Sequence, residues 1–511
     1  LGAAAVVGGL GFAGSAHAVA VFGAGSTTNA QYLLPTTGNI GHMLFTPYYT
    51  AQGSMATLFN ITNTDRVNGK AVKVRFRGAA NSDDVLDFTV FLSPGDVWTG
   101  QVVRDAATDR AVVSTPDNSC TIPVAADWPG VFKTERLAPY LSAEVAAANT
   151  REGYIEVLNM ADVDMTKVNT KGSLAYGIKH KNGVAPCADL PYADLLSTNV
   201  VQPSMAGGYE LAAPTGGLMG SWAVLNQDLL AVYSGTQTAI VATPVTTVGW
   251  SLTPTHGTGN FAFAPQIEEA INNQAFVDSN TADPLLRTGS TSGITPLWYD
   301  LPDMSTPYVN TATSPLAQAD FLSAALAKNA VYNDYVATAA GASVPMETDW
   351  VVSQPTRRYH AAVNYGTSAA TSKLEFSVSG GSATSPATTG NPYASLTMNR
   401  ALAMGPQACL SVAFSSADRE EKFQTAGGGF SPGVTSPYCG EVFTVSFGAT
   451  SPLQAALTNR TVTPVGEAGW ARLQISNNVH APVVGFAATS LKNQALGGNY
   501  GMTLQHRWFG R

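Results

Sequence analysis

The feature that most constrains the fold of this 511-residue chain is an alternation of apolar and charged residues over positions 70–77. The segment reads KAVKVRFR, so that valine and phenylalanine alternate with lysine and arginine. A period of two with one charged face predicts a half-buried antiparallel strand. The cationic face, made of Lys73, Arg75 and Arg77 with Lys70 nearby, is therefore expected to lie at the surface.

Neighbouring segments follow the same plan. Residues 56–61, 86–92 and 97–103 are further apolar runs, separated by polar turns. These turns include an Asn-Gly at 68–69, which favours a hairpin between the strands on either side, and a Pro-Gly at 94–95. Several short strands divided by turn signals predict a β-sandwich rather than a parallel α/β fold. Other expected strands are 153–158, 221–225, 350–352, 359–365, 441–447, 472–475 and 483–488.

One region departs from this pattern. Ser314 and Pro315 suit the N-cap and first position of a helix, and the Ala/Leu-rich sequence after them has helical spacing, so we expect one or two helices over 315–336. The fold class predicted is mainly β, with two immunoglobulin-like or related β-sandwich domains and a short helical segment between them. The boundaries expected are an N-terminal sandwich over 19–255, a loop-rich connector over 256–340 and a C-terminal β-rich domain over 341–511.

Charge is scarce throughout the chain. Only 12% of residues are charged, about half the usual share of around 25%, and 27 Lys+Arg against 35 Asp+Glu give a net charge of −8. A general nucleic-acid binder needs a cationic surface to displace phosphate counterions, so that class is excluded. A surface of Thr, Ser, Asn, Gly and Ala suits extracellular β-proteins and dense assemblies.

The first residues indicate export. Residues 1–14 are small and apolar, and AHA at 16–18 matches the small-x-small cleavage pattern, which predicts that 1–18 is the remnant of a secretory signal. The alternative is a buried glycine-rich strand or helix. The apolar stretch is shorter than the roughly 20 residues that a membrane-spanning helix needs.

The four cysteines occur without any C-x-x-C motif, which leaves zinc-ribbon and thioredoxin sites without ligands. An even number in an exported chain predicts disulfides. Spacing favours Cys120–Cys187 and Cys409–Cys439, one in each half of the chain, and the second would contribute about 3 kcal/mol by closing a loop of about 30 residues. The alternative is four buried free thiols.

The residues most suited to bind a metal ion in this sequence are acidic. The seven histidines are scattered, without an H-E-x-x-H motif, so zinc or iron has no predicted ligands. Calcium takes oxygen ligands from loops, and two acidic clusters offer them: Asp83, Asp84 and Asp87, then Asp162 and Asp164. The alternative is that both clusters are solvated turns or strand ends. No other cofactor is expected.

The cationic strand face is a candidate contact surface. Lys70, Lys73, Arg75 and Arg77 could contact anionic lipopolysaccharide, or the acidic turn 83–87 of a neighbouring subunit. The alternative is an exposed face that pairs within its own sheet, where charge discourages unwanted edge pairing.

No catalytic constellation emerges from the sequence. The one G-x-S-x-G match, at 429–433, places Pro432 where a hydrolase uses a backbone N–H for its oxyanion hole, and proline has none. Phosphate-binding loop motifs are absent. We therefore predict that the protein is not an enzyme.

Three segments carry a family resemblance. They are GKAVKVRFRGAANSDDVLDFTVFLSPGDVWTG at 69–100, REGYIEVLNMAD at 151–162 and TDWVVSQPTRRYH at 348–360. Together they resemble a family of secreted proteobacterial cell-surface or S-layer-like proteins. The resemblance implies an extracellular location at the cell surface and brings no catalytic residues with it.

These observations predict an exported structural cell-surface protein, a self-assembling S-layer or coat subunit whose main partner is itself. The alternative is a surface-displayed adhesin or carbohydrate-binding protein. Exposed aromatic residues in loops would support it, and Trp298-Tyr299-Asp300 in the connector is the best candidate. A secreted hydrolase lacks the residues for the chemistry.

Overall fold

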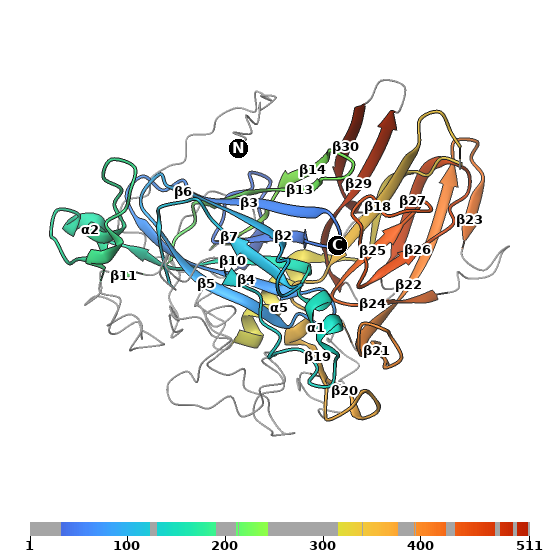
Figure 1. The fold of residues 1–511 in the computed structure, drawn as a ribbon, viewed down its shortest axis with the longest axis horizontal. Coiled ribbons are helices and arrows are strands. Elements are labelled where there is room, and N and C mark those ends of the chain that lie inside the picture. The colour runs from blue at the N-terminus through green and yellow to red at the C-terminus, as the bar shows by residue number, and fades with distance from the viewer. Residues whose placement is uncertain are drawn as a thin grey trace.

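The computed structural model describes residues 32–122, 130–190, 211–212, 214–243, 315–339, 341–376, 393, 395–425, 435–475, 481–493 and 498–508. These residues are mainly β, arranged in several sheets whose strands are almost all antiparallel, as predicted. Figure 1 shows the first half of the chain, blue to green, beside the second half, orange to red. The predicted signal (1–18), the Trp298-Tyr299-Asp300 triplet and the 429–433 motif lie outside the described residues.

The first half of the described chain, residues 32–243, forms two sheets. One has the order β1-β15-β2-β10-β4-β5-β8, with β11 pairing β10. Its strands are β1 Tyr32–Pro35, β15 Thr238–Thr243, β2 Met43–Thr50, β10 Glu152–Val163, β4 Gly69–Gly78, β5 Asp84–Leu92, β8 Cys120–Ile122 and β11 Leu211–Ala212. The other has the order β14-β13-β3-β6-β7-β9, with β12 pairing β3. Its strands are β14 Ala231–Thr236, β13 Ser221–Asn226, β3 Met55–Asn63, β6 Val97–Arg104, β7 Ala111–Ser114, β9 Gly130–Val131 and β12 Leu218–Met219.

These two sheets pack on each other through aromatic side chains. The ring centroids of Phe59 on β3 and Phe76 on β4 are 5.7 Å apart, and those of Phe88 on β5 and Trp98 on β6 are 5.4 Å apart. The four strands predicted between residues 54 and 103 therefore all form, and their apolar faces build one core.

The Asn-Gly turn does not make a hairpin, which corrects the pairing that its sequence favours. Strand β3 pairs with β6, whereas β4 pairs with β5, so the turn carries the chain from one sheet to the other. The loop is longer than the two residues of an Asn-Gly hairpin. Asn63 fixes this path, because its side-chain amide donates to the carbonyls of Asn68 and Ser93.

The second half, residues 315–508 with helix α5 (Pro315–Leu326) at its start, also forms two large sheets. One has the order β21-β22-β27-β17-β31, with β23 and β24 also pairing β22, and the other has the order β26-β25-β18-β29-β30. The strands of the first are β21 Thr397–Asn399, β22 Gln407–Asp418, β27 Ala468–Gln474, β17 Ala330–Val336, β31 Arg507–Trp508, β23 Phe423–Thr425 and β24 Thr435–Cys439. Those of the second are β26 Asn459–Thr461, β25 Val442–Ser446, β18 Met346–Ser353, β29 Val484–Asn493 and β30 Gly498–Gln505. The second half also contains two two-stranded sheets. One pairs β16 Ala327–Lys328 with β28 Ala481–Pro482, and the other pairs β19 Ala361–Asn364 with β20 Lys373–Phe376.

Most of the other predicted strands lie within these elements. The predicted strand 359–365 is only partly a strand, because its first residue belongs to the 3-10 helix η6, Arg357–Tyr359, and β19 follows. The remaining helical elements are α1 Ala143–Asn149, η2 Met165–Lys167, α2 Leu174–Ile178, η3 Cys187–Asp189 and η7 Ala369–Thr371.

The helix predicted over 315–336 is too long. Helix α5 spans Pro315–Leu326, and the chain then forms β16 and β17. The reason is visible in AVYNDYV at 330–336, where β-branched and aromatic residues favour a strand and burial alternates between Val331 and Tyr335 inside and Asp334 outside. Strand β17 pairs along its whole length with β27.

The sheets of the two halves are separate, but their cores are shared. The largest apolar cluster joins residues of the first half, such as Phe59 and Tyr233, to Val351, Val442 and Phe486 of the second. Another cluster packs α5 residues against side chains from both halves, namely Leu322 and Leu326 of α5 with Leu33, Phe45 and Val484. Helix α5 therefore helps to hold the halves together.

Candidate functional site

The predicted cationic surface is buried, which corrects the sequence-based expectation. Lys70, Lys73, Arg75 and Arg77 are each 0% exposed, and every residue of β4 is buried. The physical reason is that the charged face of β4 is covered: the Thr215 hydroxyl lies 3.1 Å from Lys70 Nζ, and the Glu156 carboxylate that binds Arg77 also contacts Arg358 of η6. Strands that are covered on both faces bury whatever residues they carry.

Acidic side chains on the neighbouring strands neutralise the basic side chains of β4. In the sheet register, Arg75 lies opposite Asp87 of β5 on one side and Glu156 of β10 on the other. The Nζ atom of Lys73 is 2.9 Å from an Asp87 oxygen. Cross-strand pairs of opposite charge stabilise a sheet, and the partners here belong to the same sheet. The alternative interpretation expected this pairing on an exposed face, whereas the face is buried.

Lys70 forms a similar pair at the other end of β4. Its Nζ is 2.9 Å from an Asp162 oxygen and 3.1 Å from the Thr215 hydroxyl. Asp162 is buried, whereas Asp164 is exposed and caps η2 by accepting from the backbone N–H of Thr166.

The acidic residues predicted to bind calcium do not converge. Asp84 lies near Arg75 (3.4 Å) and Arg77 (3.7 Å), and Asp83 accepts a 2.6 Å hydrogen bond from the Tyr365 hydroxyl. Over the described ranges, no group of three or more His, Cys, Asp or Glu side chains could hold a metal ion. The calcium hypothesis therefore finds no ligand set in this part of the chain.

A buried charge cluster joins the two halves. Glu156 of β10 accepts from Arg77 Nε at 3.2 Å and from Arg358 Nη2, which belongs to η6 in the second half, at 3.4 Å. Arg358 donates its backbone N–H to Glu441 at 2.9 Å, and the Arg357 guanidinium lies 3.8 Å from the same carboxylate. We use the name buried charge cluster for these residues: Arg77, Glu156, Arg357, Arg358 and Glu441.

Backbone contacts reinforce this junction. The Ala79 carbonyl accepts the N–H groups of Glu441 at 2.8 Å and Val442 at 3.1 Å. Nearby, buried Glu152 accepts the N–H groups of Ala456 at 2.8 Å and Leu457 at 3.2 Å. Carboxylates of the first half therefore hold backbone and side chains of the second.

Burial shifts the pKa of one carboxyl of the cluster, Glu441, and of Asp83, a nearby carboxyl outside it. Burial raises the pKa of Glu441, an effect that the neighbouring Arg357 opposes. Burial also raises the pKa of Asp83 to about 7, although the hydrogen bond from Tyr365 opposes the shift. Four of the five cluster residues lie in the segments that carry the family resemblance: Arg77 in 69–100, Glu156 in 151–162, and Arg357 and Arg358 in 348–360.

Sequence reasoning missed Glu156, Arg357, Arg358 and Glu441. A signal was available, since REGYIE at 151–156 places two glutamates among apolar residues and two adjacent arginines follow the apolar run at 350–352.

The cysteines pair as predicted. Cys120 on β8 joins Cys187 at the start of η3, with an S–S distance of 2.11 Å, and Cys409 on β22 joins Cys439 on β24, with 2.04 Å. Each bond lies within one half, so the disulfides brace the halves and the buried charge cluster connects them.

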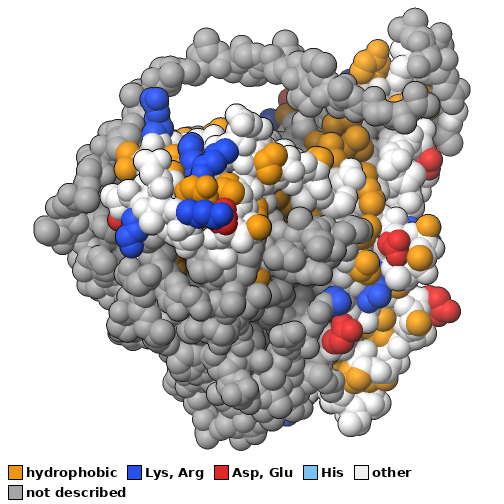
Figure 2. Space-filling model, turned by 60° about the vertical axis from the view of Figure 1, so that its left-hand side comes forward, with side chains coloured by type: hydrophobic (Ala, Val, Ile, Leu, Met, Phe, Trp, Pro, Cys, Tyr) orange, Lys and Arg blue, Asp and Glu red, His pale blue; other side chains and the backbone are white. Residues whose placement is uncertain are grey.

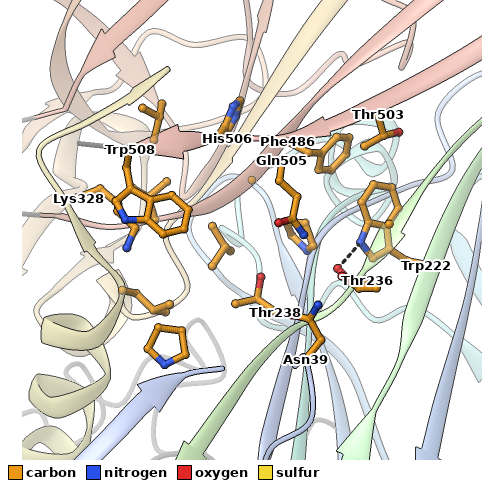
Figure 3. A pocket seen from close by; sticks show the side chains of 18 of the residues that line it. Asn39, Trp222, Thr236, Thr238, Lys328, Phe486, Thr503, Gln505, His506 and Trp508 are labelled. Atoms are coloured by element: carbon orange, nitrogen blue, oxygen red, sulfur yellow. Dashed lines mark hydrogen bonds between the residues drawn. The ribbon is translucent and has the colours of Figure 1, made fainter. Parts of the chain in front are cut away.

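A cleft of about 280 Å³ also lies between the halves. The first half contributes β1, β2, β13, β14 and β15, and the second contributes α5, β16, β17, β29, β30 and β31. Figure 3 shows Trp508 and Trp222 on opposite sides of the cleft, with Gln505, Thr238 and Asn39 between them.

Aromatic side chains dominate its two ends. Trp508 is 55% exposed, and Lys328 Nζ lies 4.1 Å from the centroid of its ring, a cation–π contact. At the other end, Trp222 packs 4.4 Å from Phe486 and donates its Nε1–H to the Thr236 carbonyl at 3.2 Å.

The cleft is almost without charge. Its described lining residues include no Asp or Glu, and Lys328 is the one cation among them. Burial lowers the pKa of His506 to about 4, so that this side chain is neutral at pH 7, with Nε2 2.8 Å from the Val351 carbonyl. Such a lining can bind a ligand by stacking and neutral hydrogen bonds.

No local signal in the sequence pointed to the cleft. Its lining is drawn from segments between residues 35 and 508, and Lys328 lies in the region where a helix was expected.

Among the residues that the structure describes, none belongs to a helix with the length and apolar character to cross a membrane. Comparison of the chain with protein-family models, with curated proteins and with solved structures found no match.

Proposed function

We propose that this protein is an exported structural subunit of a cell surface, not an enzyme, and that it self-assembles into a layer or coat through its outer sheet faces. The observation that carries the proposal is the absence of charge on the outer face of the sheet β14-β13-β3-β6. We call this surface the uncharged face.

Burial alternates along all four strands and identifies the outward positions. They are Leu58, Asn60, Thr62, Val97, Thr99, Gln101, Val103, Ser221, Ala223, Leu225, Val232, Ser234 and Thr236. None of these fully described positions is charged, and Val97 and Val232 are 43% and 47% exposed. The cores of protein–protein interfaces are depleted of charged residues, so this face, with its exposed valines, favours contact with another subunit.

A second surface lies on the outer side of the sheet of the second half. Phe423, Trp470 and Tyr332 form a row in which the Trp470 ring centroid is 6.0 Å from that of Phe423 and 6.3 Å from that of Tyr332. Phe423 is 71% exposed. Beside this row, Arg507 and Asp334 lie 3.4 Å apart.

Aromatic residues and arginine are enriched at protein interfaces. Adjacent charges of both signs suit a contact between two identical surfaces, where each charge can face its opposite in the other copy. Two different contact surfaces on one subunit allow an assembly to extend beyond a dimer. The buried charge cluster supports the proposal by making the two halves one body.

The finer fold prediction, two immunoglobulin-like or related β-sandwich domains with a helical segment between them, forms part of the proposal. It is supported by the packed sheets of the first half. The extracellular location is supported by the two disulfides, which persist in oxidising compartments.

Anchoring to an anionic surface such as lipopolysaccharide is proposed for a different set of cations from the buried strand. Lys167, Lys171, Lys179 and Lys181 lie around α2 within 15 residues, and all are exposed or half-buried. Figure 2 turns this side of the molecule forward and shows Lys and Arg side chains gathered there. Reversing the charge of Lys167 and Lys181 to Glu should reduce binding to lipopolysaccharide vesicles at low salt, because exposed charges act through screened attraction.

Electron microscopy and sedimentation of the purified protein, with and without calcium, test self-assembly. Leu58→Lys places a charge at the centre of the uncharged face and should leave monomers where the native protein forms ordered arrays. Val67→Lys is the matched control, because Val67 is 52% exposed in the turn before β4, outside this face. Strictly monomeric native protein under all conditions would overturn the proposal.

A further inference from the structure

We infer that the cleft between the halves binds an uncharged carbohydrate, with one sugar ring stacked on Trp508. This inference is independent of self-assembly. It takes up the carbohydrate-binding alternative at a site other than the Trp298 triplet.

The first argument is that one side of the Trp508 ring is exposed. Lys328 lies above its centroid and therefore covers one side of the indole, yet Trp508 remains 55% exposed. A sugar ring presents C–H groups on its flat side, and these pack well on an exposed aromatic surface. The cation also restrains the ring, which lowers the entropy lost when a ligand binds.

The second argument is a set of polar groups without protein partners. The side chains of Asn39, Thr238 and Gln505 make no hydrogen bond to any described residue. In Figure 3 all three lie between Trp508 and Trp222. Amides and hydroxyls both donate and accept, which matches the hydroxyl groups around the edge of a sugar.

The third argument is charge. A cationic ligand would find no carboxylate among the described lining residues, and the one cation, Lys328, is already engaged with Trp508. The cavity of about 280 Å³ is just below the range of roughly 300–1,000 Å³ for small-molecule pockets. The ligand is therefore neutral, and the enclosed part of it is small.

Calorimetric titration with maltotriose, cellotriose, chitotriose and mannotriose tests the inference on the whole chain. At least one should bind the native protein, and Trp508→Ala should weaken that binding at least tenfold. Trp470→Ala is the control, because Trp470 is 40% exposed on the outer side of the same sheet. Gln505→Ala should weaken binding to a smaller extent, and thermal unfolding should be unchanged in all three variants.

Three results would overturn the inference: no binding of any of the four sugars, equal binding by Trp508→Ala, or equal loss in Trp470→Ala. Capture of an apolar peptide by the cleft in place of sugars would assign it to a different partner. The Leu58→Lys protein separates this inference from the proposed function, since it should remain monomeric and still bind the sugar.

Discussion

The buried charge cluster and the cleft both lie between the two halves of the chain, yet they are built from opposite kinds of side chain. In the cluster, Arg77, Glu156 and Arg358 are at most 3% exposed, and Glu156 pairs with Arg77 of its own sheet and with Arg358 across the junction. In the cleft, neutral amides, hydroxyls and aromatic rings predominate. A chain with only 12% charged residues thus places part of its charge inside, where it joins the halves, and presents a neutral surface for recognition.

The energetics of burial explain this division. Two charges removed from water recover their desolvation cost only when partners and hydrogen bonds are well placed, and loss of one partner leaves an uncompensated buried charge. A contact of this kind tolerates one arrangement of the halves and disfavours others. We therefore propose that the cluster fixes how the halves dock, whereas the cleft is a space that the docking creates.

The largest expected effect comes from breaking the cluster. Glu156→Gln keeps the shape of the side chain but leaves Arg77 and Arg358 without their shared carboxylate. We expect the free energy of unfolding to fall by about 3–5 kcal/mol, measured by urea denaturation.

Glu144→Gln, at an exposed position of α1, is the control and should change stability by less than about 0.5 kcal/mol. Equal stability of the two variants would mean that the cluster contributes nothing to the junction.

A second, smaller effect depends on pH. Burial raises the pKa of Asp83 from 3.8 to about 7, so the folded protein holds a proton that the unfolded chain releases above pH 4. This group therefore makes the free energy of unfolding fall as pH rises from about 4 to about 7. Asp83→Asn cannot titrate, and its stability relative to the native protein should rise over that window by on the order of 2–4 kcal/mol.

Urea denaturation at several pH values measures this difference. Burial lowers the pKa of His42 to about 3 and that of His360 to about 4, which acts in the opposite direction, but these groups are present in both proteins and cancel. The exposed Asp228→Asn variant should show a difference that does not depend on pH. A flat profile for Asp83→Asn would show that Asp83 is ionised throughout.

The smallest effect concerns the cleft. Lys328→Met keeps the length of the side chain but removes the cation over Trp508. A cation–π contact is worth about 0.5–1 kcal/mol at exposed sites, so the affinity for the sugar identified above should fall roughly two- to fivefold. Calorimetry measures it, and an unchanged affinity would show that Lys328 does not position the ring.

Local patterns predicted the elements well. The alternation at 70–77 and the turns around it gave the four strands between residues 54 and 103, because side chains alternate sides along any strand. The disulfide pairing also followed from the chain, since each bond joins cysteines within one half.

Predictions that depended on neighbours were wrong. The alternation at 70–77 correctly predicted a strand with two different faces. It could not show that both faces of β4 would be covered. The end of helix α5 was placed ten residues too late, because pairing with β27 draws residues 330–336 into a strand. The Asn-Gly turn fitted a hairpin locally, while packing between sheets favoured the crossing.

The sequence by itself determined a mainly β chain, the strand positions and the cysteine pairs, since these depend on periodicity and separation along the chain. Only the tertiary structure decided that Lys70, Lys73, Arg75 and Arg77 are buried, that Glu156 meets Arg358 and that Trp508 and Trp222 line one cleft. Burial and charge pairing depend on what covers a strand, and the residues that do so come from segments hundreds of positions away.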